Sequence, residues 1–106
     1  MKKGMIKLTV VYPFAEGKTF DMDYYCNKHM AMVSVFLGDT LKGMTVEKGI
    51  TGVAPNSPAP YAAMGNMYFD SIEAFQEAFS RADQLMGDIP NFTNIEPIFQ
   101  ISEVMM

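Results

Sequence analysis

Strand-like and helix-like segments alternate along these 106 residues, and their order constrains the fold more than any single motif does. We expect strands at 4–13, 41–50, 61–69 and 95–104, where β-branched and aromatic residues gather between turn residues. We expect helices from Thr19 or Phe20 to residue 37 and from residue 71 to about Met86, where apolar residues recur at helical spacing. The order β-α-β-β-α-β predicts an α+β, ferredoxin-like fold whose antiparallel sheet carries both helices on one face.

The residues at the ends of these segments support their boundaries. Gly38 follows the first helix as a C-terminal cap. Asp70, with Glu73 three residues later, forms a capping box at the start of the second helix. The last strand contains Pro97, which cannot donate a hydrogen bond in the middle of a sheet, so we expect that strand at an edge. The stretch 51–60 is rich in Pro, Gly and Ser and is expected to be a loop.

Length and composition exclude several classes of protein. We expect a chain of this size to form a single domain over residues 1–106. The net charge is −4 and the lysines are scattered, so we expect no nucleic-acid partner. No apolar run reaches the roughly 18 residues of a membrane helix, and no secretory signal is evident, so we expect no membrane association and a cytoplasmic protein. The single cysteine, Cys26, excludes an intramolecular disulfide.

The expected sheet has more apolar residues than one helix-covered face can bury. Ten apolar residues of the expected strands cannot all face the helices: Met5, Val11, Met44, Val46, Met64, Met67, Phe69, Ile98, Phe99 and Ile101. A bare sheet face that is half apolar is usually covered by another surface. We therefore expect a homodimer in which two sheets pack against each other.

The first helix carries the only histidine of the chain, His29, on its apolar side. At about 100° per residue, one arc of this helix collects Met22, Tyr25, Cys26, His29, Met32, Val33 and Phe36. Imidazole suits acid–base work near neutral pH, and Tyr25, one turn earlier, could donate a hydrogen bond to an oxyanion. The alternative is a structural histidine and a core tyrosine. Tyr24 falls off the arc and is expected at the surface or at a subunit interface.

Three stretches resemble the EthD family, which belongs to the dimeric α+β barrel superfamily. They are Val11-Tyr12-Pro13, the helix pattern Phe20-x-x-x-Tyr24-Tyr25-x-x-x-His29-Met30, and Tyr68-Phe69-Asp70-Ser71. The resemblance covers roughly residues 5–104. After Met30, relatives often have Pro then Leu, whereas this chain has Ala31-Met32, so we expect a more regular helix here.

The resemblance implies a pocket between the sheet and the helices of each subunit. We expect His29 and Tyr25 to be catalytic there and a small apolar or aromatic ligand to contact Tyr12, Met22, Cys26, Met32, Val33 and Phe36. The family is named for a protein tied to bacterial ether degradation, which points to the catabolism of xenobiotics. Fungal relatives are dehydratases or decarboxylases of aromatic polyketides, and superfamily relatives include cofactor-free monooxygenases, cyclases and a lactone isomerase.

Two functions from different classes follow. The first is a cofactor-free enzyme of proton-transfer type (a lyase or isomerase, or else a monooxygenase), with His29 as acid or base. The second is a non-catalytic binding or accessory protein of a degradation pathway. Asp21 and Asp23 do not form a metal-ligand pattern with His29, and no glycine-rich phosphate loop is present, so we expect no metal and no nucleotide cofactor. A third hypothesis, a dimer that binds heme or handles oxygen, rests on fold analogy alone.

Overall fold

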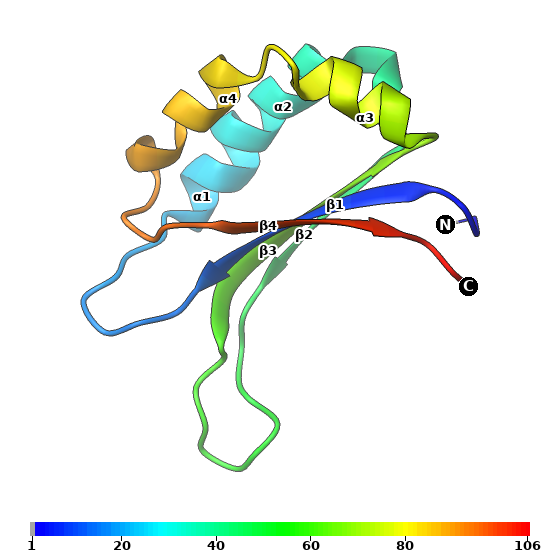
Figure 1. The fold of residues 1–106 in the computed structure, drawn as a ribbon. Helices are drawn as coiled ribbons and strands as arrows, with labels where there is room; N and C mark the ends of the chain where they lie inside the picture. Colours follow the sequence, from blue (N-terminus) through cyan, green and yellow to red (C-terminus); the bar gives the residue numbers. More distant parts are fainter. Residues whose placement is uncertain (1) are drawn as a thin grey trace.

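A four-stranded antiparallel sheet forms one layer of the molecule, and helices form the other (Figure 1). The computed structural model describes residues 2–106. The strands are β1 (Ile6–Pro13), β2 (Gly43–Lys48), β3 (Tyr61–Phe69) and β4 (Ile98–Glu103), in the spatial order β2-β3-β1-β4. The ferredoxin-like β-α-β-β-α-β order is thus confirmed. The strand that follows Pro97 does lie at an edge of the sheet.

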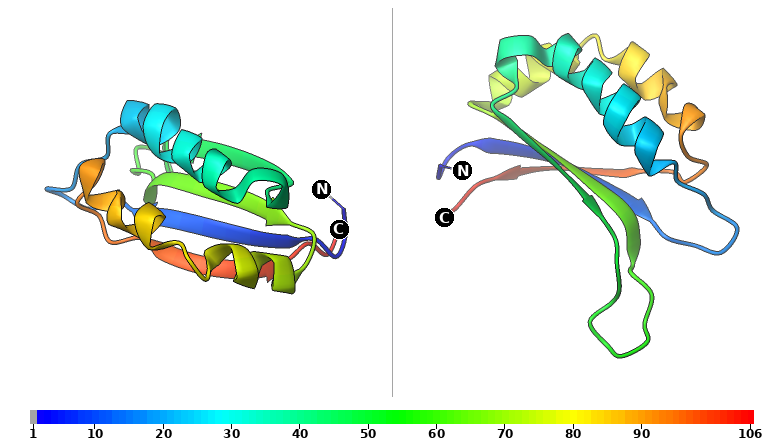
Figure 2. Two further views of the ribbon diagram at one scale, coloured as in Figure 1. Left: turned by 90° about the horizontal axis from the view of Figure 1, so that it is seen from above. Right: turned by 180° about the vertical axis from the view of Figure 1, so that it is seen from behind.

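Both helical regions cover the same face of the sheet, side by side (Figure 2). The first consists of α1 (Met22–Tyr24), a π-helical turn η1 (Tyr25–His29) and α2 (Met30–Leu37), followed by the 3-10 turn η2 (Gly38–Thr40). The second consists of α3 (Ile72–Phe79), α4 (Asp83–Gly87) and the 3-10 turn η3 (Ile89–Asn91). In the described part of the chain, 2–106, no helix has the length and apolarity needed to cross a membrane.

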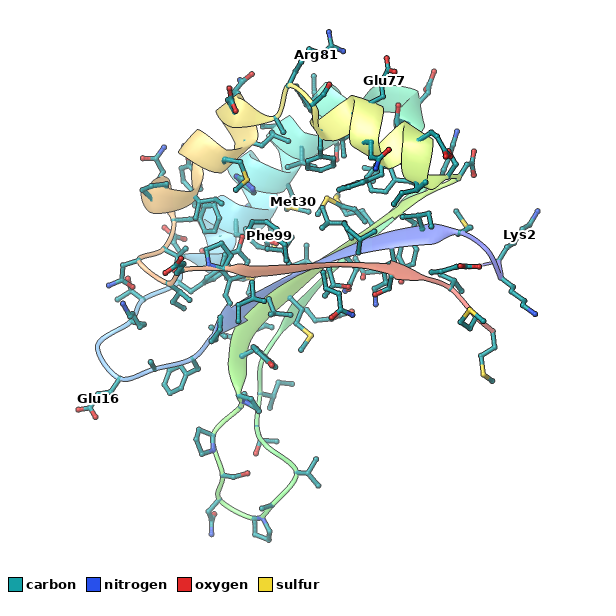
Figure 3. All side chains as sticks on the ribbon, viewed as in Figure 1. Lys2, Glu16, Met30, Glu77, Arg81 and Phe99 are labelled. Carbon is teal, nitrogen blue, oxygen red and sulfur yellow. The ribbon has the colours of Figure 1, made fainter. Side chains whose placement is uncertain are left out.

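The strand register determines which side chains meet the helices. Leu8, Val10 and Tyr12 of β1 point to the helix side and are buried. Their cross-strand partners in β3 are Met67, Gly65 and Ala63, which therefore share this side. Figure 3 shows the side chains that fill the space between sheet and helices, with Met30 among them. Within residues 2–106, no helix or strand covers the opposite face of the sheet.

The second helix departs from the expectation of one continuous segment. It is interrupted between Phe79 and Asp83, because the Ser80 hydroxyl donates a hydrogen bond to the carbonyl of Glu77 (2.7 Å) and competes with the helical ladder. The N-cap is also shifted by one residue. Ser71, and not Asp70, accepts the hydrogen bond of the Ala74 amide (3.1 Å). Asp70 instead lies 3.9 Å from Lys42 Nζ at the surface.

The first helix is less regular than the sequence suggests. It starts at Met22, where the Asp21 side chain accepts the Tyr24 amide hydrogen, and Gly38 closes it with φ of 54° as expected. Between these ends, the Met30 amide bonds to the carbonyl of Tyr25, five residues earlier. This π turn inserts one extra residue before Met30, whereas the segment that contains Ala31 and Met32 is a regular α-helix.

Gly65 in β3 leaves space for the Tyr25 side chain to lie directly against the sheet. The Tyr25 hydroxyl lies against Gly65, in the place that a β-carbon at this position would need. Tyr25 is only 1% exposed, so its ring has little room to move away. The absence of a side chain at residue 65 therefore fixes how deeply Tyr25 is buried.

We expect Gly65→Ala to destabilise the protein by about 1–3 kcal/mol, the usual cost of overpacking a core. Urea unfolding would measure this loss. In a Tyr25→Phe background the added methyl group meets no hydroxyl, so the cost of Gly65→Ala should shrink in the double variant. Gly87→Ala is a suitable control because nothing lies within 4 Å of its β-carbon position. An equal cost of Gly65→Ala in both backgrounds would contradict this interpretation.

Candidate functional site

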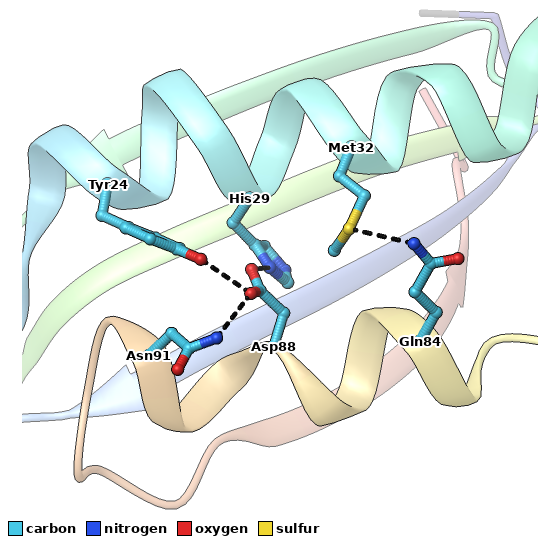
Figure 4. A network of polar contacts seen from close by, with 6 residues as sticks. All are labelled: Tyr24, His29, Met32, Gln84, Asp88 and Asn91. Carbon is cyan, nitrogen blue, oxygen red and sulfur yellow. Dashed lines mark hydrogen bonds and ion pairs between the residues drawn. The ribbon is translucent and has the colours of Figure 1, made fainter.

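The candidate site is centred on an imidazole–carboxylate pair. His29 Nδ1 lies 2.9 Å from Asp88 Oδ2, and His29 is 6% exposed (Figure 4). The other carboxylate oxygen of Asp88 accepts hydrogen bonds from the Tyr24 hydroxyl (2.8 Å) and from the Asn91 side-chain amide (2.9 Å). Both oxygens of Asp88 therefore have hydrogen-bond partners. Of the two imidazole nitrogens of His29, Nδ1 contacts Asp88 and Nε2 does not.

The π turn explains how Tyr24 and His29 reach the same carboxylate. In a regular α-helix, residues five apart point in directions that differ by roughly 140°. A π turn closes a hydrogen bond over five residues, so residues at this spacing come close to the same side. The turn also stacks the Tyr25 and His29 rings, whose centroids are 5.6 Å apart with an interplanar angle of 13°. Asp88, on the neighbouring helical region, faces this side of the turn.

The surroundings of Asp88 favour its ionised form. Partial burial by itself raises the pKa of the Asp88 carboxyl, but the hydrogen bonds from Asn91, His29 and Tyr24 together outweigh it and hold the pKa below its usual range. The same carboxylate raises the pKa of the Tyr24 hydroxyl, mainly because that hydroxyl donates a hydrogen bond to Asp88. At neutral pH the site therefore holds a carboxylate and a phenol.

His29 also lines a small cavity between the helices and the sheet. The cavity measures about 40 Å³, which is enough for one or a few water molecules. Its lining is apolar except for three groups, Tyr12, Tyr25 and His29. The remaining lining residues are Leu8, Val10, Met30, Val33, Met67, Phe79, Leu85, Met86, Ile89 and Phe99. Since Asp88 is not in the lining, the imidazole separates the carboxylate from the cavity.

The two tyrosines of the cavity remain protonated. Tyr12 and Tyr25 are each 1% exposed, and their ring centroids are 5.6 Å apart. Burial raises the pKa of Tyr25 to about 12. Burial, together with the neighbouring Tyr25 phenol, raises the pKa of Tyr12 far above its ordinary range. Both hydroxyls can therefore serve as hydrogen-bond donors inside an apolar space.

Aromatic packing holds the imidazole in place. The ring centroid of Phe92 is 4.7 Å from that of His29 and 5.0 Å from that of Tyr25. Phe20 lies against Tyr12, Tyr25 and Phe92 at centroid distances of 4.9–5.4 Å. These contacts come from four separate segments of the chain, around residues 12, 20, 25–29 and 92, so the orientation of His29 depends on the tertiary fold.

Only part of the expected ligand-contacting set reaches the cavity. Tyr12 and Val33 line it, as do the expected catalytic residues His29 and Tyr25. Four other residues of the expected set lie outside the lining: Met22, Cys26, Met32 and Phe36. Cys26 is exposed, with its thiol 3.7 Å from Met22 Sδ, and the Met32 sulfur accepts a hydrogen bond from Gln84 (3.6 Å). The π turn rotates the residues before it relative to those after it, which a uniform helical spacing cannot represent.

The sequence did not identify Asp88 and Asn91 as site residues, and it assigned Tyr24 to the surface or an interface. The structure instead places Tyr24 half-buried against Asp88. One signal was present in the sequence. Asp88 follows directly on the C-terminus of α4, where the helix dipole disfavours negative charge, so an acidic residue there needs another stabilising partner.

The fold and the site together define a small α+β protein with a ferredoxin-like sheet and a helix-covered cavity. The sequence profile of the EthD domain matches residues 17–96. An EthD-like protein from Ralstonia eutropha JMP134 is 44% identical, with a TM-score of 0.92 and coverage of 99% of this chain and 96% of that one. The chain belongs to the EthD family.

More distant structures extend this picture. An ethyl tert-butyl ether (EthD) family protein from Bacillus halodurans C-125 is 25% identical, with a TM-score of 0.74 and coverage of 95% of this chain and 99% of that one. A dimeric ferredoxin-like protein of unknown function from Thermobifida fusca YX is 10% identical, with a TM-score of 0.60 and coverage of 98% and 94%. At that identity the likeness shows the fold alone. No curated protein matches this chain.

We expect the contribution of Asp88 to stability to depend on pH. Because its folded-state pKa is depressed, the stabilisation is present above the ordinary carboxyl range and is lost as the pH falls through the folded-state value. Asp88→Asn should therefore lower the free energy of unfolding most near neutral pH and least at about pH 3. Urea unfolding of both proteins across this range measures the difference. Asp83→Asn, on the same helix, is the control, and a difference that does not shrink in acid would contradict the assignment.

Proposed function

We propose that this EthD-family protein is a cofactor-free enzyme of proton-transfer type, with His29 as its acid–base group. The observation that carries the proposal is the 2.9 Å contact between His29 Nδ1 and Asp88, on an imidazole that lines an apolar cavity. Because Nδ1 of His29 is hydrogen-bonded to the Asp88 carboxylate, Nε2 is the nitrogen that can exchange a proton with a ligand. Two protonated phenols, Tyr12 and Tyr25, lie in the same cavity.

These groups support chemistry next to a carbonyl group. Nε2 of His29 accepts a proton from the carbon beside the carbonyl, and the C–H electron pair moves to form an enolate. The Tyr25 or Tyr12 hydroxyl donates a hydrogen bond to the enolate oxygen. The imidazolium then returns the proton. Delivery to another carbon gives isomerisation, and delivery to a departing β-hydroxyl gives dehydration, with water as the leaving group. In a decarboxylation the C–C bond to a substrate carboxylate breaks and CO₂ leaves, and His29, which must start this reaction as imidazolium, gives its proton to the resulting carbanion.

The lining also restricts the class of ligand. Apart from His29 and the two phenols, the cavity offers apolar side chains, with Met30, Met67 and Met86 among them. Methionine adapts its shape to varied apolar ligands. In residues 2–106, no three His, Cys, Asp or Glu side chains gather as a metal site would need. We propose a small apolar or aromatic carbonyl compound as the ligand, in line with the expectation from the family resemblance.

We expect His29→Gln to lower kcat/KM by about 10²–10⁴, the usual contribution of general acid–base catalysis. Turnover would be measured on a panel of small aromatic ketones and hydroxyketones. Cys26→Ala, an exposed position on the same helix, should leave the rate unchanged and serves as the control. Turnover that survives in His29→Gln would refute the enzymatic role of His29. Tight binding without turnover, undiminished in His29→Phe, would instead favour a binding or accessory protein.

We also propose that the protein is a homodimer that packs through the open face of the sheet. Val11 on this face pairs with Met64 in β3 and with Ile98 in β4, so three apolar residues are adjacent. They line a shallow hollow of about 800 Å³ on the side away from the helices. Beside them, Asn66 accepts a hydrogen bond from Thr9 (3.2 Å) and donates to Thr45 (3.1 Å). A second copy of the same face would cover the apolar group.

The loop between β2 and β3 supports the same proposal. It extends well beyond the sheet on the side opposite the helices (Figure 2). Two of its apolar residues are almost fully exposed, Ile50 at 90% and Val53 at 106%. A second sheet packed on the open face would lie within reach of this loop, so the loop adds apolar surface to the proposed interface.

We expect Ile98→Asp to weaken the dimer, because it places a charge among apolar residues of the proposed interface. Size-exclusion chromatography with light scattering would measure the mass in solution over a range of concentrations. Val35→Asp is the matched control, since Val35 is 84% exposed on the helical side of the molecule. A wild-type monomer, or a dimer that Ile98→Asp leaves intact, would refute this interface.

A further inference from the structure

We propose that Asp88 is a positioning residue that fixes the tautomer of His29, and that Tyr24 and Asn91 enable it to do so by holding its other oxygen. This inference rests on the proposed acid–base role of His29. It concerns a group that no motif of the chain identifies. The structural basis is a carboxylate whose two oxygens have different and fixed partners (Figure 4).

The first step concerns the proton between His29 and Asp88. The ionised carboxylate of Asp88 can only accept hydrogen bonds, so the nitrogen that faces it at 2.9 Å carries the proton. In the neutral imidazole, Nε2 is then unprotonated and can accept a proton. The opposite tautomer would direct an N–H group toward the cavity and would have no basic nitrogen there.

The second step concerns the orientation of the carboxylate. Tyr24 and Asn91 both donate to Oδ1 of Asp88, at 2.8 and 2.9 Å, and leave Oδ2 for His29. Asn91 comes from η3, three residues after Asp88, while Tyr24 comes from the first helical region. The carboxylate is thus held from its own segment and from the helix that bears His29. Its plane cannot turn without losing one of these bonds.

The arrangement predicts an unusual outcome for Asp88→Asn. The amide oxygen of the new side chain would keep the Oδ1 place, because both Tyr24 and Asn91 donate there. Its NH₂ group would then face Nδ1 of His29 and donate to it. Nδ1 must lose its proton to accept this bond, so the neutral imidazole should switch to the tautomer protonated on Nε2.

The experiment is ¹⁵N NMR of the imidazole in protein labelled at histidine, at a pH where the ring is neutral. Because His29 is the only histidine of the chain, its two nitrogens give one unambiguous set of signals. We expect the Nδ1–H tautomer in the wild type and the Nε2–H tautomer in Asp88→Asn. If Asp88→Asn keeps the wild-type tautomer, Asp88 does not position the imidazole and the inference is wrong.

A second variant tests the role of Tyr24. In Asp88→Asn/Tyr24→Phe only Asn91 still donates to the amide oxygen, so the amide is held less firmly and a measurable fraction of the Nδ1–H tautomer should return. Asp88→Asn/Tyr68→Phe is the matched control, since it removes a tyrosine hydroxyl on the opposite face of the sheet. Equal tautomer ratios in these two double variants would refute the role of Tyr24. Circular dichroism confirms that each variant is folded.

The same variants separate this inference from the proposed function. If His29 is the base, Asp88→Asn should lower kcat by about 10²–10⁴ with little change in KM, because the wrong tautomer faces the ligand. A tautomer switch accompanied by undiminished turnover would support the positioning role and refute His29 as the base. Loss of activity in His29→Gln, with no tautomer switch in Asp88→Asn, would support His29 as the base and refute the positioning role of Asp88.

Discussion

One backbone hydrogen bond, from the Met30 amide to the Tyr25 carbonyl, determines the geometry of the site. It widens the first helix by one residue and brings Tyr24 and His29 to the same side. Without it, a carboxylate on the neighbouring helical region could meet one of these side chains but not both. The depth of Tyr25 beside Gly65 and the stacking of Tyr25 on His29 depend on the same turn. The π turn therefore links the backbone conformation of the first helix to the relative positions of Tyr24, Tyr25 and His29.

The two faces of the sheet have different chemistry although they use the same strands. On the helix face, Tyr12 and Tyr25 are removed from water, which keeps their protons bound and makes any hydrogen bond they donate effective. On the open face, Asn66 is only 4% exposed, yet its side chain is satisfied by Thr9, Thr45 and Glu47. That cluster is polar and fully paired, so it tolerates either water or a second protein surface above it.

Local patterns along the chain predicted the fold well, but the site only partly. The bounds of β3 and the cap at Gly38 follow from residue types that act within a few positions, and they were correct. The capping residue was misplaced by one position, because Asp70 and Ser71 can both cap a helix and only tertiary contacts choose between them. Asp88 could not be assigned, since its role arises from a contact with a residue 59 positions away. Cys26 was assigned to the wrong side because helical spacing assumes a uniform turn.

The size of the cavity shows which part of the structure must adapt to a ligand. About 40 Å³ is well below the roughly 150 Å³ of a cavity that admits benzene. Two walls are fixed, since β1 and β3 are central strands and the helix that bears His29 is packed on them. The remaining wall comes from Leu85, Met86 and Ile89, in the short segments that follow the break after α3. Two lining residues are partly exposed, Met86 at 47% and Phe99 of the edge strand at 43%. Asp88 lies within this wall segment and joins it to His29 and Tyr24, so a displacement of this segment would also act on the bond that orients the imidazole.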